Sequence, residues 1–326
     1  MIGHTSIDAA AIVTVIIPTY NRASTIGRAI ASVENQKNIS AHVIVVDDGS
    51  TDDTVQIIRS ASKKSKILLI KQANRGACTA RNTGIDRVIT EYVAFLDSDD
   101  EMLPDHLCRS VINIQDSKKM ISYSKVIGAR ASDKYVIRPS RAIHEKEKMA
   151  DYLVRHKGFV QTSTLVMRTE IAKKVRYRED VTFGDDTDFA IRLSLLGCQF
   201  KMLSEPSVIW HDEIREDRLS ERKRTEFSIK WLCDLKYNIP ARAYYGYLGW
   251  HVAKDRFSSR PIWALAQYSK AVAIGAYPIR LALIVLAQII VAPTTYRKLA
   301  DFFSERDKFL NQPQGVERGG PPRKVK

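Results

Sequence analysis

The stretch YVAFLDSDD, residues 92–100, places an apolar strand directly before the three carboxylates of Asp97, Asp99 and Asp100. Open α/β sheets bind their ligands at the carboxyl ends of strands. Carboxylates spaced as Asp97-x-Asp99 can share one hard divalent cation, which usually keeps waters and takes substrate phosphates as its other ligands. The stretch therefore predicts a site where a metal meets a nucleoside diphosphate. The alternative is an acidic helix N-terminus before Pro104, because Asp is favoured there.

Strands and helices alternate through the first hundred residues. The expected strands are residues 13–18, 42–48, 66–71 and 92–96, and the expected helices are residues 24–35 and 78–88, with another beginning near Asp52. Near-continuous apolar strands between helices indicate a mostly parallel sheet that is covered on both faces. Polar residues suited to ligand binding follow the strands: PTYN (18–21), DDGS (47–50), NRG (74–76) and DSDD (97–100).

The second half is expected to complete this α/β unit and to add a helical region. Strands are expected at 162–168, 199–203 and 207–210, and helices at 105–116, 146–156 and 183–197, with weak strand signals over 120–143. From about Leu219 onward, four helical segments are separated by Pro240, Pro261 and Pro278. The Pro/Gly-rich, basic tail at 312–326 is expected to be disordered.

Size and composition narrow the class of protein. A chain of 326 residues can hold one large α/β domain and a smaller appendage. Its four cysteines form no CxxC pair, which argues against a zinc or disulfide framework and fits a reducing cytosol. The net charge of +14 is concentrated in the second half of the chain. Because no nucleic-acid-binding module is recognisable, the sequence favours an anionic membrane surface or a phosphorylated substrate as partner.

The apolar run LALIVLAQIIVA, residues 281–292, leaves two interpretations open. It is shorter than the roughly twenty residues that a membrane span needs. It is either a buried core helix or an interfacial helix anchored by Arg280, Arg297 and Lys298. Peripheral attachment is preferred to a transmembrane anchor, which predicts a cytoplasmic protein at the cytoplasmic face of the inner membrane.

Five motifs in order carry a resemblance to a known family: VTVIIPTYNR, VIVVDDGSTDDT, NRGACTARNTGI, YVAFLDSDDEMLP and FGDDTDFAIRL. Over roughly residues 12–212 the chain resembles the family 2 inverting glycosyltransferases of the GT-A fold, and most of all the bacterial exopolysaccharide and other surface-glycan transferases. The resemblance implies a Rossmann-like α/β catalytic domain. The expected organisation is an extension (1–11), a catalytic domain (12–215) divided into a nucleotide-sugar half (12–100) and an acceptor half (101–215), a helical region (216–311) and the tail (312–326).

The resemblance also implies roles for residues of the donor site. Those assigned to the nucleotide-sugar are Pro18, Thr19, Tyr20, Asp47, Arg81, Asp97 and Ser98. Asp97 and Asp99 correspond to the family's DxD motif, which would bind Mn²⁺ or Mg²⁺, with His211 as a further metal ligand. Alternatives remain at each place. Asp47 and Asp48 could serve turn and cap chemistry, Arg81 could lie on a solvated helix face, and a lone His is often structural.

The acidic pair before the last helix of the catalytic domain corresponds to the family's base. Inversion by single displacement needs a carboxylate that takes the proton of the acceptor hydroxyl. The resemblance assigns this role to Asp186, with Asp185 beside it where relatives often have Glu, while Asp188 is expected to be structural. The alternative is a helix N-terminus that is simply rich in Asp. No QxxRW motif is present, which argues against a processive synthase.

The resulting hypothesis is a metal-dependent inverting glycosyltransferase. It would move one sugar from a nucleotide-diphosphate donor, a UDP-sugar, to a growing surface glycan, whether free or lipid-linked. Two alternatives stay open. A sugar nucleotidyltransferase also combines such a sheet with Mg²⁺, but PTYNRAST (18–25) lacks a Gly-rich phosphate loop and a lysine. A non-catalytic nucleotide-sugar binder or membrane scaffold would have no need of the carboxylates of Asp97, Asp99 and Asp186.

Overall fold

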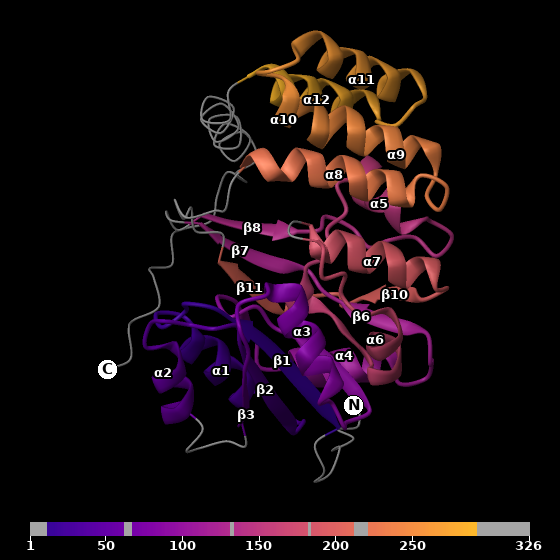
Figure 1. Ribbon diagram of the computed structural model, residues 1–326. Coiled ribbons are helices and arrows are strands. Elements are labelled where there is room, and N and C mark those ends of the chain that lie inside the picture. The colour runs from indigo at the N-terminus through magenta and orange to yellow at the C-terminus, as the bar shows by residue number, and fades with distance from the viewer. Residues whose placement is uncertain (1–11, 62–66, 131–133, 182–183, 212–220, 292–326) are drawn as a thin grey trace, which may run out of the picture.

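The computed structural model describes residues 12–61, 67–130, 134–181, 184–211 and 221–291. The expected extension (1–11) and tail (312–326) lie outside these ranges, as do the expected anchors Arg297 and Lys298. Figure 1 shows an α/β part, in indigo to magenta, followed by a stack of helices in orange and yellow at the opposite end of the molecule.

The central sheet has seven strands in the order β10-β6-β9-β4-β1-β2-β3. They are β1 Val13–Thr19, β2 Ala41–Asp47, β3 Ile67–Lys71, β4 Tyr92–Phe95, β6 Met120–Tyr123, β9 Val166–Arg168 and β10 Gln199–Met202. β1 pairs in parallel with β2 and β4, so the polar residues that follow these strands share one edge. β9 runs antiparallel to both β4 and β6, so the mostly parallel sheet that the sequence predicts contains one reversed strand.

The strand expected at 162–168 is only half correct. Thr162–Thr164 form a short 3-10 helix, η1, and the strand begins at Val166. The side chain of Gln161 accepts a hydrogen bond from the Ser163 amide at 2.9 Å, which stabilises this turn. The turn places Ser163 beside the end of β4, where its hydroxyl oxygen accepts a hydrogen bond from the Asp97 amide. The pattern of apolar residues gives no sign of this hydrogen bond. For that reason the sequence predicts a longer strand than the structure contains.

Helices cover both faces of the sheet, as the strand pattern predicts. They are α1 Ile26–Glu34, α2 Thr54–Ala61, α3 Ala77–Asp86, α4 His106–Ile114, α5 Met149–Arg155, α6 Thr169–Val175 and α7 Asp185–Leu195. Successive side chains of a strand point to opposite faces. Val15 and Ile17 of β1 therefore join one apolar core with α1 and α4, while Ile16 joins the other with α3 and α7. Burial on both faces explains why the strands are almost entirely apolar.

A second sheet lies beside the site and has the order β5-β11-β7-β8. Its strands are β5 Glu101–Met102, β7 Val126–Arg130, β8 Lys134–Arg138 and β11 Val208–His211. β11 pairs antiparallel with β5 and places Ile209 opposite Glu101. The weak strand signals over 120–143 thus correspond to β6, β7 and β8, and the ends of β4 and β11 come together in space.

The C-terminal region is helical, as predicted. It contains α8 Glu221–Leu235, α9 Ala241–Tyr247, the π-helical turn η2 Leu248–Val252, α10 Ala253–Arg256, α11 Pro261–Ala273 and α12 Ile279–Ile290. Figure 1 shows α8 next to the α/β part, and α11 and α12 at the far end. Trp231, Leu232 and Leu235 of α8 belong to the larger α/β core, which joins the two regions.

The described part of the apolar run, residues 281–291, is buried on one side and exposed on the other. Leu281, Val285 and Ile289 of α12 pack into a small core of the helical region. Ile279 and Leu283 on the same helix are exposed to 83% and 64%. Nowhere in the described ranges does a helix combine the length and the apolarity needed to cross a bilayer.

Candidate active site

Arg81 of α3 joins the two acidic motifs. Its guanidinium donates one hydrogen bond to Asp97 Oδ1 at 2.7 Å and another to Asp185 Oδ2. The Arg81 side chain is 5% exposed, so it is not on a solvated helix face. Burial alone would lower its pKa, but the Asp185 and Asp97 carboxylates raise the pKa of Arg81 above its usual value. Residues separated by about a hundred positions in sequence therefore meet in one site.

Asp100 is a buried anchor for the end of β4. Its carboxylate accepts hydrogen bonds from Gln161 Nε2 at 2.6 Å, from the Ser163 hydroxyl at 2.7 Å and from the His211 amide at 3.2 Å. Burial and the charges of Asp97 and Asp99 raise the pKa of Asp100 well above its ordinary value. It caps no helix, because α4 begins at His106. The helix-cap interpretation of this carboxylate is therefore wrong.

Asp99 and His211 do not meet directly in the structure. Asp99 is about one-third exposed, and its Oδ2 lies 3.7 Å from Arg22 Nε. His211, at the end of β11, places Nε2 2.8 Å from Glu101 Oε1. Its role as a metal ligand stays a prediction, since the ring is already paired with another carboxylate.

The acidic pair lies at the first turn of α7. Asp186 Oδ1 accepts a hydrogen bond from the Thr187 amide at 2.7 Å. Burial, together with the charge of Asp185, raises the pKa of Asp186 to about 7. A carboxylate with a pKa near the working pH is suited to act as a general base. Asp188 is buried and accepts from Arg192 Nε and Trp231 Nε1, in agreement with its expected structural role.

The other expected donor-site residues surround the ends of β1 and β2. Pro18 and Thr19 end β1 and are buried, whereas Tyr20 is 44% exposed. The Thr19 hydroxyl is buried and has no hydrogen-bond partner among the described residues. A buried hydroxyl without a hydrogen-bond partner lowers the stability of the folded protein. This is expected of a group that forms its hydrogen bond with a bound ligand.

Asp47 and Asp48 have different environments. Among the residues that the structure describes, Asp47 Oδ1 accepts one hydrogen bond, of 3.2 Å, from the Ser50 amide. Asp48 accepts from the Gln72 side chain and from the amides of Arg75 and Gly76, all within 2.9 Å. The turn interpretation therefore applies to both residues, to Asp47 through Ser50 and to Asp48 through Arg75 and Gly76, and Asp47 accepts fewer hydrogen bonds than Asp48 among the described residues. Ser98, the last of the expected donor-site residues, is buried between Asp97 and Asp99.

The carboxylates that follow β4 are the candidate ligands for a divalent cation. Over the residues that the structure describes, no three His, Cys, Asp or Glu side chains are grouped as a metal cluster. Asp97 and Asp99 nevertheless offer carboxylate oxygens, the ligands that Mg²⁺ and related hard ions prefer. Burial raises the pKa of Asp97 despite its hydrogen bond to Arg81, and Asp99 adds to the effect. A local excess of negative charge fits a cation held by Asp97 and Asp99.

Sequence reasoning did not identify Gln161 and Ser163 as part of this site. Gln161 reaches both Asp100 and, at 3.4 Å, Asp97 Oδ2. Neither residue belongs to one of the five motifs, and the turn that carries them reads as strand. Arg22 was also missed as a neighbour of Asp99, although it ends the motif VTVIIPTYNR.

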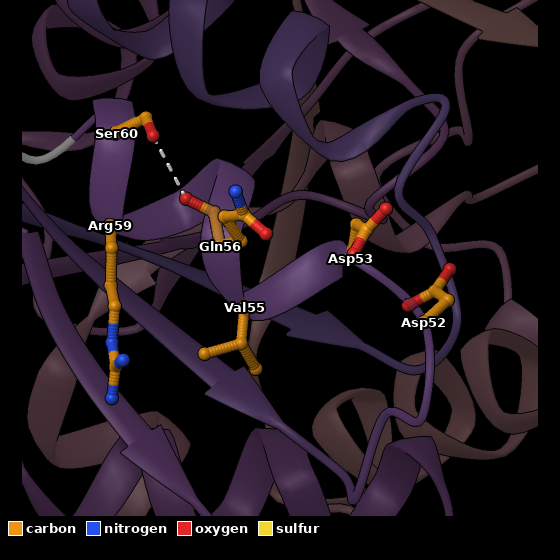
Figure 2. A pocket seen from close by; sticks show the side chains of 6 residues that line it. All are labelled: Asp52, Asp53, Val55, Gln56, Arg59 and Ser60. Atoms are coloured by element: carbon orange, nitrogen blue, oxygen red, sulfur yellow. Dashed lines mark hydrogen bonds between the residues drawn. The ribbon is translucent and has the colours of Figure 1, made fainter.

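A surface depression of about 530 Å³ lies along α2, away from these carboxylates. Figure 2 shows its lining residues: Asp52, Asp53, Val55, Gln56, Arg59 and Ser60. They belong to a single helix and the turn before it, and the hydrogen bond drawn joins Ser60 to the carbonyl of Gln56. The residues that line this depression do not bring charged groups from different elements together. The candidate active site is therefore the group of carboxylates at the ends of β1, β2 and β4.

Comparison with known proteins agrees with this geometry. A family model described as glycosyl transferase family 2 matches residues 14–176. The amylovoran biosynthesis glycosyltransferase AmsB of Erwinia amylovora is 32% identical over 244 residues, which cover 72% of this chain and 81% of AmsB.

Solved structures show the same fold at low sequence identity. TarS 1-349 of S. aureus in complex with UDP aligns with a TM-score of 0.56 and 20% identity, over 90% of this chain and 91% of the other. The mannosyltransferase PcManGT of Pyrobaculum calidifontis, in complex with GDP-Man and Mn²⁺, aligns with a TM-score of 0.57 and 18% identity, over 92% of this chain and 87% of the other. Both likenesses support the GT-A type of fold.

Proposed function

The chain belongs to glycosyltransferase family 2, and on that premise we propose that it transfers one sugar, with inversion, from a UDP-sugar to a growing surface glycan. The observation that carries the proposal is the Arg81 bridge, which holds the donor-side carboxylate Asp97 and the acidic pair of α7 in one site. AmsB, named for the biosynthesis of amylovoran, supports a glycan as the acceptor.

Asp47 and Thr19 are proposed to hold the nucleotide. Asp47 keeps an oxygen for a base N–H, and the Thr19 hydroxyl is buried without a partner. Tyr20, exposed at the end of β1, offers a ring for the base or ribose. UDP in TarS and GDP-Man in PcManGT support a nucleoside diphosphate, and the choice of uracil rests on the resemblance to surface-glycan transferases.

Asp97 and Asp99 are proposed to hold Mn²⁺ or Mg²⁺. When bound, such an ion neutralises the diphosphate as its charge increases on departure from the sugar. Mn²⁺ in PcManGT supports this assignment. His211 would serve as a third ligand; in the structure its Nε2 lies 2.8 Å from Glu101 Oε1, so coordination through Nε2 would compete with this carboxylate.

Asp186 is proposed to take the proton of the acceptor hydroxyl. Asp185 cannot do so while its carboxylate is bound to Arg81, but its negative charge helps to raise the pKa of Asp186. Asp186 therefore binds a proton readily and still ionises near neutral pH. This division of roles explains why two adjacent carboxylates are useful at the start of α7.

A donor screen tests the function. Thermal unfolding is measured with UDP-, GDP- and dTDP-sugars, each with and without Mn²⁺, beside an assay for released nucleoside diphosphate. A ligand at a hundred times its Kd stabilises the native state by about 2.7 kcal/mol. We expect a metal-dependent rise in Tm with UDP-sugars that Asp99→Asn removes. Release of pyrophosphate would indicate a nucleotidyltransferase, and no stabilisation or turnover of any nucleotide-sugar would refute the proposal.

An anionic membrane surface is proposed as a second partner. Ile279 and Leu283 are exposed on α12, the helix that also carries the exposed Arg280, and Ile262 is exposed on α11. Figure 1 shows α11 and α12 at the far end of the molecule. Apolar side chains flanked by basic ones favour the interface of an anionic bilayer. This placement would put the enzyme at the cytoplasmic face of the inner membrane, close to a lipid-linked acceptor.

Vesicle sedimentation tests this placement. The wild-type protein is expected to sediment with anionic vesicles, more weakly with neutral ones, and Leu283→Glu is expected to reduce the bound fraction severalfold. Ile112→Glu on α4 is the matched control, since Ile112 is also about half exposed but lies elsewhere. Equal binding of both variants would exclude α12 as the contact.

A further inference from the structure

The polar face of α3 is buried, which is unusual for a helix in an α/β protein. Thr79, Arg81 and Asn82 are each no more than 4% exposed. Burying polar groups costs free energy unless they are hydrogen-bonded. On its apolar side α3 packs on β1, where Gly84 lies directly against Ile16. The partners of the polar side chains therefore decide what this helix does.

The Asn82 carboxamide binds both the carbonyl and the amide of the Tyr177 backbone. Its Nδ2 donates to the Tyr177 carbonyl at 2.8 Å, and its Oδ1 accepts from the Tyr177 amide at 2.9 Å. The carboxamide offers a donor and an acceptor on one rigid group at any pH near neutrality, which matches the carbonyl and amide of one residue. The amide thus fixes one peptide segment that comes shortly before α7 in the chain.

Glu179 receives three further hydrogen bonds from the same part of the donor half. Thr79 donates at 3.1 Å, Asn82 at 3.2 Å and Arg75 at 3.2 Å. The hydrogen bond from Asn82 is the largest cause and lowers the pKa of Glu179; burial opposes it, and the hydrogen bond from Thr79 and the charge of Arg75 lower the pKa further. Glu179 is therefore ionised and held at neutral pH.

The contacts follow one another in order along both segments. Asn82 meets Tyr177, Thr79 meets Glu179, and Cys78 donates from its thiol to the Val181 carbonyl at 3.3 Å. Arg81, between Thr79 and Asn82 on the same helix, binds Asp185, the first residue of α7, and lies outside this order. Residues 177–181 are thus held along α3, and the same helix also holds the first residue of α7.

We propose that Thr79, Asn82 and Glu179 form a clamp that positions the base-bearing start of α7 against the donor site. The inference rests on the proposed function, because the clamp has a catalytic consequence only if Asp186 is the base. It gives the motif NRGACTARNTGI a role beyond nucleotide contact: the motif couples the donor half to the acceptor half. Asn82 and Glu179 are positioning residues, since neither contacts the carboxylates of Asp97, Asp99 or Asp186.

The clamp predicts a separation of donor binding from transfer. The proposed nucleotide and metal contacts lie at the ends of β1, β2 and β4 and at Arg81, and none of these residues is Thr79, Asn82 or Glu179. Loss of the clamp should leave donor affinity unchanged and should displace Asp186 relative to the sugar. A misplacement of about 1 Å can cost about a hundredfold in rate.

The test compares Asn82→Ala and Glu179→Gln with the wild type. Asn82→Ala removes both hydrogen bonds to Tyr177, and Glu179→Gln replaces one accepting oxygen with a donor that faces Thr79 and Arg75. Asp86→Asn is the matched control, because the ion pair of Asp86 with Arg176 also joins α3 to the segment before α7 but lies at the surface. Each variant is first checked for cooperative thermal unfolding.

For both clamp variants we expect kcat to fall about 10- to 100-fold while the Kd for UDP with Mn²⁺ stays within about twofold. Amide hydrogen exchange at Tyr177 should become faster in Asn82→Ala, and Asp86→Asn should retain the wild-type kcat. An unchanged kcat in both clamp variants, or a loss of UDP affinity that matches the loss of kcat, would overturn the clamp. An inactive wild type would instead overturn the proposed function on which the clamp depends.

Discussion

Replacing Asp186 by Asn removes the proton-accepting group with little change in shape. The amide oxygen of Asn can still accept from the Thr187 amide, as Asp186 Oδ1 does at 2.7 Å. General-base catalysis contributes about 10²- to 10⁴-fold to a rate. At 1.36 kcal/mol per factor of ten, the variant should therefore raise the activation free energy by about 2.7–5.4 kcal/mol. Binding of the donor and the metal should be unaffected.

The pH dependence follows from the position of the Asp186 carboxylate. Burial and the charge of Asp185 raise its pKa to about 7, and only the ionised form can accept a proton. About 90% of the carboxyl groups are ionised one unit above this pKa and about 10% one unit below it. Wild-type kcat/KM should therefore increase about tenfold between pH 6 and pH 8, and this increase should be absent in Asp186→Asn.

The assay measures released nucleoside diphosphate under initial-rate conditions, with Kd for the donor measured separately by calorimetry. Asp105→Asn serves as control, because Asp105 is an exposed carboxylate paired with Arg109 on α4. Activity of Asp186→Asn within threefold of the wild type, or a persisting rise with pH, would refute the assignment of the base. A wild type that binds the donor and transfers nothing would favour a non-catalytic nucleotide-sugar binder.

The remaining predictions concern stability, measured as the free energy of urea unfolding. Gly84→Ala should destabilise the protein by about 1–3 kcal/mol, because a Cβ there would lie 2.5 Å from Ile16 Cγ2. The control Gly27→Ala should not destabilise it, because the nearest neighbour of a Cβ at that position lies at 3.6 Å. Equal stabilities of the two variants would contradict the close contact of α3 with β1. Trp231→Phe should cost about 1–3 kcal/mol, since it leaves Asp188 Oδ1 without the indole N–H at 2.8 Å, whereas exposed Tyr237→Phe should be neutral. No loss in Trp231→Phe would show that this bond does not hold α8 to α7.

Much of the fold follows from local chemistry. The continuous apolar runs of β1, β2 and β4 are typical of strands that are buried on both faces, and the structure confirms them within one or two residues. Gly197 has a φ of 87°, as expected for the residue that stops α7. The reversed strand β9 was not predicted as such, because the direction of a strand within a sheet depends on partners far away in the chain.

The candidate site also contains residues that the local sequence identifies and residues that only distant contacts reveal. The motifs identified the aspartates of the site, since Asp residues after an apolar strand or at a helix start are visible in the sequence, but not Glu101, which pairs with His211. Gln161 and Ser163 were missed because they act through a turn that forms only when β9 packs beside β4. The role of Asp48 also required its partners, the amides of Arg75 and Gly76.

The sequence by itself determined the strand–helix alternation, the family resemblance and the set of carboxylates, because each of these depends on residue type and spacing along one segment. Only the tertiary structure decided how the carboxylates are used. Arg81 joins Asp97 to Asp185, burial beside Asp185 raises the pKa of Asp186, and Asn82 holds Tyr177. These effects depend on distance and burial in space, which linear spacing does not specify.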